Sequence, residues 1–298
     1  MKLIENPKIT SINALPPRSI IKPENKITDL CGEYDFRYDG GEWGKLAVPS
    51  MWQYHGFGTP RYTNVDYPFP FNPPYICVHN PIGEYKRTFN IEVLSEKTVI
   101  HFDGVDNAFF VYINGQQAGF AKGSRNMHEF DISKLVRLGE NELYVKVYTY
   151  SDASYMEAQD MILASGIFRS VYLIETDDVS VWDYTIKTTM TEIEVSVDVD
   201  LKDGYKLLVT VDGQKTSDKE HTFKIENPKL WNCEEPNLYD VTIELYRSGS
   251  ITERHVKRVG MREVEIIDGR LCINKVPILL KGVNRHEYVP DNGTKHIY

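Results

Sequence analysis

Apolar and polar residues alternate along much of this 298-residue chain. The clearest case is EIEVSVDVDL at 192–201, in which every second residue is Ile, Val or Leu and the others are polar. Alternation also marks 109–113 and 142–150, and Asn-Gly at 114–115 separates the first of these from the apolar residues at 117–120. Period-two patterning predicts strands with one buried face, and Asn-Gly between apolar runs is typical of a β-hairpin. Helical periodicity is almost absent, so we expect a mainly β protein.

The spacing of these strands predicts four regions. Residues 1–30 are polar and interrupted by prolines, which is typical of an arm lying over a domain. Residues 31–176 hold short strands over a length that suits a jelly-roll sandwich. Residues 177–267 show strands and turns at the spacing of an immunoglobulin-like sandwich. Residues 268–298 differ from all of these.

The pattern of residues in this last region predicts a β-hairpin whose second strand leads into a cluster of polar residues. Apolar residues at 271–273 and 277–280 flank Asn274-Lys275, and the second run leads directly into KGVNRHE at 281–287. Catalytic groups of a parallel barrel sit at the C-terminal ends of its strands. We therefore expect the first strand of a truncated (β/α)8 barrel.

Charge and composition exclude several classes of partner. The formal net charge is −9 with a pI near 5.5, so the chain lacks the basic surface that nucleic acid requires. No apolar run approaches the roughly 20 residues of a membrane helix. The opening MKLIENPKIT has no signal-peptide core, which predicts a cytoplasmic location. The four cysteines have no metal or redox spacing. The 19 tyrosines fit a β-rich fold, and they also fit a sugar binder whose rings stack on pyranose faces.

Several segments together resemble the β-galactosidases of glycoside hydrolase family two. They occur in the family's order over about residues 30–290, and they read PSMWQ (49–53), RYTNVDYPFP (61–70), FDGVDN (102–107), GSR (123–125), QDM (159–161), SGIFR (165–169), NPKLWNCEEPNLY (227–239), VGMREV (259–264) and GVNRHE (282–287). The resemblance implies a sugar-binding jelly roll, an immunoglobulin-like second domain and the start of a catalytic barrel. It also implies a homo-oligomer for the full-length enzyme, with sodium and magnesium as cofactors.

The family's mechanism is a retaining hydrolysis of terminal β-galactosyl residues. One Glu protonates the leaving oxygen and a second attacks the anomeric carbon, with the carboxyl groups about 5 Å apart. In the family both follow Asn-Glu segments deeper in the barrel. The one Asn-Glu here is Asn141-Glu142, in a jelly-roll strand. We therefore expect the catalytic pair beyond residue 298 and an inactive chain when it is alone.

The resemblance implies four substrate-binding residues. Asn64, with Val65 beside it, matches an asparagine that reaches the galactose pocket, although an Asx turn explains Asn64 without a function. Asp160 matches an aspartate that contacts the galactose 6-hydroxyl and helps to bind sodium, where the ordinary alternative is a surface loop aspartate. His286 matches a histidine that supports the transition state, where the alternative is an unremarkable strand-end histidine. Ile162 departs from the family pattern, which has Trp there, and puts the packing of this loop in doubt.

Two other hypotheses remain open. A non-catalytic carbohydrate-binding module of two sandwiches explains the composition and the missing carboxylates, but it has no use for GVNRHE. A β-glucuronidase or β-mannosidase relative would share the fold, whereas the YTN and QDM segments favour galactose. A complementing chain that carries the rest of a barrel would restore a complete site under the first hypothesis.

Overall fold

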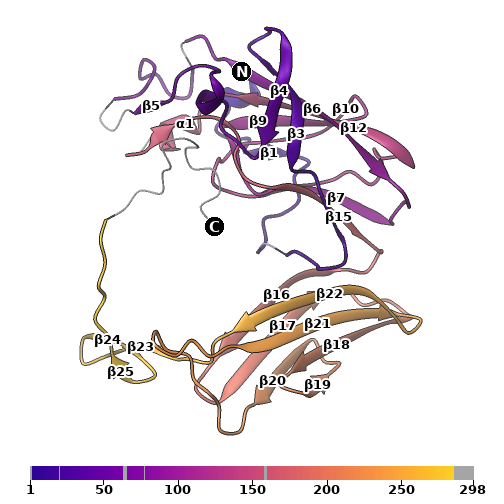
Figure 1. Ribbon diagram of the computed structural model, residues 1–298, viewed down its shortest axis with the longest axis vertical. Coiled ribbons are helices and arrows are strands. Elements are labelled where there is room, and N and C mark those ends of the chain that lie inside the picture. The colour runs from indigo at the N-terminus through magenta and orange to yellow at the C-terminus, as the bar shows by residue number, and fades with distance from the viewer. Residues whose placement is uncertain (1, 20, 63–65, 77, 158–159, 285–298) are drawn as a thin grey trace. The chain divides into compact units, whose positions relative to one another are not determined.

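A computed structural model describes residues 2–19, 21–62, 66–76, 78–157 and 160–284 (Figure 1). The chain is mainly β and divides into two compact units. The first contains the N-terminal residues to Pro17 and then Thr28–Glu175, and the second contains Arg18–Ile27 and Thr176–Asn284. Within the described ranges, no helix is long and apolar enough to cross a membrane.

The first unit is a sandwich of two antiparallel sheets. The larger has seven strands in the order β1 (Ser11–Ile12), β10 (Gln116–Ala121), β9 (Ala108–Ile113), β12 (Gly139–Tyr148), β6 (Ile82–Ile91), β3 (Gly32–Tyr38) and β4 (Trp43–Val48). The smaller has four, in the order β11 (His128–Asp131), β7 (Lys97–Phe102), β15 (Val171–Thr176) and β2 (Ile27–Asp29). Inward side chains of both sheets form one hydrophobic core. The jelly-roll prediction for this part of the chain is confirmed.

The β9–β10 hairpin forms as its turn sequence predicts. Ile113 pairs with Gln116 across Asn114 and Gly115, whose φ angles are 51° and 77°. A two-residue turn with both φ angles positive matches the right-handed twist of its strands, and Asn-Gly adopts it at the lowest steric cost. The local sequence thus sets the register of the two strands.

Trp52 is a core residue. It lies in the 3-10 helix η2 (Trp52–His55), is 0 % exposed, and packs against Phe36 and Tyr85. A Cβ at Gly83 would lie 2.4 Å from the indole, so only glycine fits there. Trp52 therefore fills the sandwich and offers no surface to a sugar.

The N-terminal segment is divided between the units. The 3-10 helix η1 (Leu3–Glu5) and β1 belong to the first, where the ammonium of Lys122 binds the Asn6 carbonyl at 3.0 Å. Residues 18–27 belong to the second, where the Glu24 N–H donates to the Arg254 carbonyl at 2.9 Å.

The second unit is also a two-sheet sandwich. Its sheets run β16 (Val181–Thr188), β17 (Glu192–Val199) and β20 (Glu220–Lys224), and β19 (Gln214–Thr216), β18 (Tyr205–Val211), β21 (Tyr239–Arg247) and β22 (Ser250–Val259). The alternating β17 residues Ile193, Val195, Val197 and Val199 are all buried in its core. The prediction of an immunoglobulin-like sandwich is confirmed.

The C-terminal hairpin is shorter than expected. A small sheet joins β23 (Val264–Ile267), β24 (Arg270–Ile273) and β25 (Val276–Pro277). Its last hydrogen bond runs from the Ile278 N–H to the Leu271 carbonyl, and 278–284 contain no strand. Leu279 and Leu280 are 79 % and 76 % exposed, because no described strand lies beside them. Residues 285–287 of the expected barrel strand lie outside the described residues.

Candidate functional site

A cavity of about 850 Å³ lies within the first unit. Two short pairings build its wall and rim. β8 (Val105–Asp106) pairs with β14 (Gly166–Ile167), and β5 (Arg61–Tyr62) pairs with β13 (Ile162–Leu163). Segments that are far apart in the chain therefore meet here. The acidic and basic side chains that line the cavity are Arg61, His79, Asp106, Arg125, Glu157 and Arg169.

Glu157 organises the polar wall. It ends the helix α1 (Ser154–Glu157), and its carboxylate accepts the Ser124 N–H and hydroxyl at 2.8 and 2.6 Å. The same carboxylate accepts the side-chain N–H of Asn107 at 2.8 Å. Hydrogen bonds to an ionised acceptor are stronger than neutral ones. Glu157 thus fixes the 123–125 loop and the end of β8 together.

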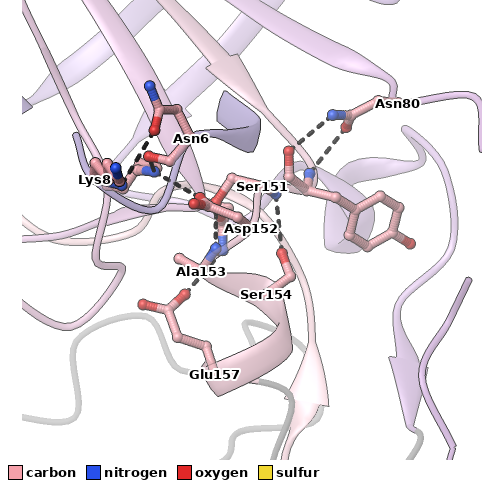
Figure 2. A network of polar contacts seen from close by, with 11 residues as sticks. Asn6, Lys8, Asn80, Ser151, Asp152, Ala153, Ser154 and Glu157 are labelled. Carbon is pink, nitrogen blue, oxygen red and sulfur yellow. Dashed lines mark hydrogen bonds and ion pairs between the residues drawn. The ribbon is translucent and has the colours of Figure 1, made fainter. Parts of the chain in front are cut away.

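The turn before Glu157 is fixed independently. Asn80 clamps Tyr150, donating to its carbonyl at 2.8 Å and accepting its N–H at 2.9 Å. The Ser154 hydroxyl accepts the Ser151 N–H at 3.0 Å, and the Ser151 hydroxyl accepts the Ala153 N–H at 3.1 Å (Figure 2). These contacts leave the backbone at 150–154 little freedom, so α1 presents Glu157 to the cavity in a defined position.

Asp106 is the chemically most perturbed carboxyl of the cavity. Its side chain is 16 % exposed and lies 3.5 Å from the Arg125 guanidinium. Burial raises the pKa of Asp106 to about 7, with the nearby Glu157 charge adding to the effect and Arg125 opposing it. Near neutral pH this carboxyl can therefore donate or accept a hydrogen bond, which suits a ligand hydroxyl.

Two arginines share one aromatic ring beside Asp106. The guanidinium carbons of Arg125 and Arg169 lie 4.8 and 5.1 Å from the Phe168 ring centroid, and Arg169 donates to the Arg125 carbonyl at 3.2 Å. Phe168 is 1 % exposed and so holds both cations against a rigid support. The cavity thereby offers cationic donors beside the carboxyls, which suits a polyhydroxylated ligand.

Asp160 lies next to the β5–β13 pairing, which brings the YTN and QDM segments together. Its neighbour Met161 lines the cavity, whereas Asp160 does not. Ile162 on β13 pairs with Tyr62 on β5, and the Tyr62 hydroxyl donates to the Asp160 carboxylate. This hydrogen bond raises the pKa of Tyr62. Ile162, which replaces the family Trp, thus takes part in the pairing. Asn64, Val65 and His286 lie outside the described residues.

The expected sodium site is represented by one carboxylate. Asp160 supplies an oxygen of the type that hard cations prefer. No group of three or more His, Cys, Asp or Glu side chains that could hold a metal ion occurs in the described part of the chain. The sodium site, with Asp160 as one ligand, stays a prediction.

Sequence reasoning missed the side chains that form the cavity wall. Asp106, Asn107, Ser124 and Arg125 fall within segments that carry the resemblance, but no periodicity distinguishes them. Glu157 lies 33 residues from Ser124 and 50 from Asn107 along the chain, and only the fold joins them. The available signal was the clustering of polar residues in the FDGVDN and GSR segments.

Comparisons with known proteins agree with this architecture. Residues 33–177 match the sugar binding domain of the glycosyl hydrolases family 2, and residues 172–262 match the glycosyl hydrolases family 2. Among solved structures, a β-glucuronidase from Ruminococcus gnavus in complex with D-glucaro-d-lactam has a TM-score of 0.72 at 21 % identity, over 95 % of this chain and 53 % of that chain. The β-D-glucuronidase of Dictyoglomus thermophilum has a TM-score of 0.71 at 21 % identity, over 92 % and 51 %.

At this identity the structural likeness shows a shared fold, and the chain spans about half the length of those structures. The two family matches overlap at residues 172–177 and cover both sandwiches, in the order in which the sequence places them. The chain belongs to glycosyl hydrolase family 2, of which it holds the sugar-binding domain and the immunoglobulin-like domain.

Proposed function

We propose that this chain is the N-terminal portion of a retaining β-galactosidase and that it supplies one wall of the galactose pocket. The observation that carries the proposal is the β5–β13 pairing, which sets Tyr62 against Asp160 and brings Arg61 and Leu163 to the cavity wall. These residues belong to the YTN and QDM segments, which are the parts that resemble galactosidases. Asp160 would accept the galactose 6-hydroxyl, with Asn64, Val65 and His286 completing the contacts.

The chemistry itself would come from elsewhere. A retaining hydrolysis needs two carboxyl groups about 5 Å apart on either side of the scissile bond. The acid/base and nucleophile Glu would follow residue 298, and sodium and magnesium would serve the complete enzyme, with Asp160 as one sodium ligand. The complete enzyme would be a homo-oligomer, or a complementing chain would carry the rest of the barrel.

A β-glucuronidase is the second candidate. The solved structures with this fold include β-glucuronidases, and the cavity contains Arg61, Arg125 and Arg169. Guanidinium groups bind carboxylates well, and a uronic acid carries one. Against this, the Asp160 carboxylate beside the β5–β13 pairing would repel a uronate and would accept the 6-hydroxyl of a neutral sugar.

The test is complementation with two substrates. The chain is mixed with the purified barrel fragment of a family relative and assayed on nitrophenyl β-galactoside and nitrophenyl β-glucuronide. Hydrolysis of the galactoside by the mixture, but not by the unmixed chain, supports the proposal. Hydrolysis of the glucuronide by the mixture supports the second candidate. Activity of the unmixed chain would contradict the expectation that the two catalytic Glu residues lie outside it. Silence with both substrates would leave the binding-module hypothesis, tested by calorimetric titration with galactose.

Asp160→Asn sharpens this assay. If the carboxylate accepts the 6-hydroxyl, the variant should lose galactoside activity and should gain tolerance of the glucuronide. Asp203→Asn is the matched control, because Asp203 is an exposed aspartate in a turn of the second unit. If Asp160→Asn and Asp203→Asn were both as active as the wild type, Asp160 would not be part of the site.

A further inference from the structure

The seven-stranded sheet has a second face that points away from the core, and its two halves differ. The N-terminal segment covers one half, where Ile4 packs with Phe120 of β10, Phe110 of β9 and Tyr148 of β12. Ile4 and Phe120 are 6 % and 0 % exposed. The fold therefore covers the apolar residues of this half with its own chain.

The other half presents aromatic rings to solvent. Tyr112 on β9 and Tyr144 on β12 are direct cross-strand partners, with ring centroids 5.4 Å apart, and both are partly exposed. Trp43 lies on the edge strand β4 and is 40 % exposed. Strand order places it three strands from Tyr144, which corresponds to roughly 14 Å. The three rings thus extend across the sheet over the length of a short oligosaccharide.

Fixed polar groups lie between the rings. The Arg37 guanidinium binds the Glu84 carboxylate through two hydrogen bonds of 2.8 and 2.9 Å, and the Tyr144 hydroxyl donates to the same carboxylate. The Lys86 ammonium lies 5.0 Å from the Trp43 ring centroid and 5.9 Å from that of Tyr144. Bidentate pairing and cation–π contacts hold these long side chains in place. The half-face is therefore ordered before any ligand arrives.

Charges on this half compensate one another. The outward residues of β3, β4, β6 and β12 include basic and acidic side chains in alternation, namely Arg37, Lys45, Lys86, Lys146, Glu33, Asp35 and Glu84. Lys45 also pairs with Asp35 at 2.8 Å. A surface with balanced charge has little attraction for a strongly anionic or cationic partner. Its complement is a neutral ligand with many hydroxyl groups.

We propose that Trp43, Tyr144 and Tyr112 form a binding platform for a neutral oligosaccharide on this outer face. The apolar faces of pyranose rings would stack on the aromatic rings, and sugar hydroxyls would exchange hydrogen bonds with Lys86, Arg37 and Glu84. The platform lies on the outer face of the larger sheet, and none of its residues lines the cavity. It would hold a polymeric sugar independently of the proposed galactosidase function.

The test is calorimetric titration of the chain with β-1,4-galactotetraose. Loss of one stacking ring should lower affinity about tenfold in Trp43→Ala and in Tyr112→Ala. Trp43→Phe keeps a ring and should keep most of the affinity. Phe71→Ala is the control, since Phe71 is 69 % exposed but is not part of the platform. Thermal unfolding of each variant checks that the sandwich is intact.

Each outcome bears on the platform. Galactotetraose binding that is lost in Trp43→Ala, retained in Phe71→Ala and unchanged by added salt supports it. The absence of binding heat would overturn it, as would equal affinity of Trp43→Ala and wild type. Tighter, salt-sensitive binding of an oligogalacturonate would overturn the neutral-ligand assignment. Because Asp160→Asn leaves the platform intact, its failure in the hydrolysis assay is separable from all of these results.

Discussion

The two sandwiches are built from the same alternating pattern but bury different chemistry. The first unit buries Lys122, Asp152, Asn107 and His101 together with its apolar core. In the second, the buried polar side chains within the described residues are Thr176 at its start and Glu244, Glu253 and His255 on neighbouring strands. Burying charge costs stability unless it is paired, and both sandwiches pair the ionisable groups that they bury. What distinguishes the first unit is the cavity described above, which its buried Asn107 helps to line.

The largest expected effect comes from breaking the buried ion pair of the first unit. Lys122 and Asp152 lie 2.6 Å apart and are 4 % and 7 % exposed. Lys122→Met leaves Asp152 as an uncompensated buried charge, which should cost about 3–5 kcal/mol. Denaturant unfolding followed by hydrogen exchange should show the loss in β9, β10 and β12, with the second unit unchanged.

Lys187→Met is the matched control, because Lys187 and Glu194 form an exposed pair at 3.5 Å in the second unit. Its cost should stay below about 1 kcal/mol. Similar losses for Lys122→Met and Lys187→Met would contradict the contrast between the two sandwiches.

Truncating a buried side chain in the second unit should give the next largest loss of stability. Ile193 on β17 is 0 % exposed in an apolar core, so Ile193→Ala should destabilise by about 2–4 kcal/mol. The loss should be confined to hydrogen exchange of β16–β22. Ile251→Ala is the control, since Ile251 is 37 % exposed on β22. Destabilisation of β9 and β12 by Ile193→Ala would show that the units do not unfold separately.

Removing the perturbed carboxyl should stabilise the first unit. Because the folded pKa of Asp106 is about 7, above its unfolded value, the fold favours the protonated form. Stability is therefore highest at low pH and falls as pH rises from about 4 to 7. Asp106→Asn should remove this fall and add on the order of 2 kcal/mol at pH 8. Thermal unfolding across this pH range gives the measurement, and an unchanged profile would contradict the assignment.

The smallest expected effect concerns His101 in the four-stranded sheet. Burial opposes its charge, but Asp103 at 2.6 Å and Glu129 at 2.9 Å outweigh burial and raise its pKa. The stabilisation that the charged His101 gives the folded state is thus fully present below the unfolded-state pKa, near 6.5. It is lost as pH rises through the folded-state pKa.

NMR titration should show His101 as imidazolium above pH 6.5, whereas burial lowers the pKa of His128 on the adjacent strand. Identical titration of the two histidines would contradict this reading. His101→Gln should abolish the alkaline loss of protection in β7 and β11.

The local sequence predicted the features that depend on neighbouring residues, namely which strand residues are buried and where a hairpin turns. Alternation at 192–201 placed Ile193 and its partners in the core, and Asn114-Gly115 set a hairpin. The cavity was not predictable in this way, since Glu157 meets Ser124 and Asn107 only after the sheets have paired. The resemblance predicted a role for Asp160, which stays a prediction, and it could not indicate that Tyr62 would donate to its carboxylate. The expected strand ends at Pro277 because no neighbouring strand continues the ladder.

The placement of Arg18–Ile27 in the second unit has a consequence for synthesis. The Asn25 side chain donates to the Thr252 carbonyl, a partner 227 residues later in the chain. At 5–20 residues per second, Asn25 leaves the ribosome roughly 10 to 45 seconds before Thr252. The first sandwich can fold during that interval, whereas the residues that contact segment 18–27 have not yet been synthesised. The second sandwich is therefore completed by a segment that is translated before most of the first sandwich, so the two units cannot fold in strict chain order.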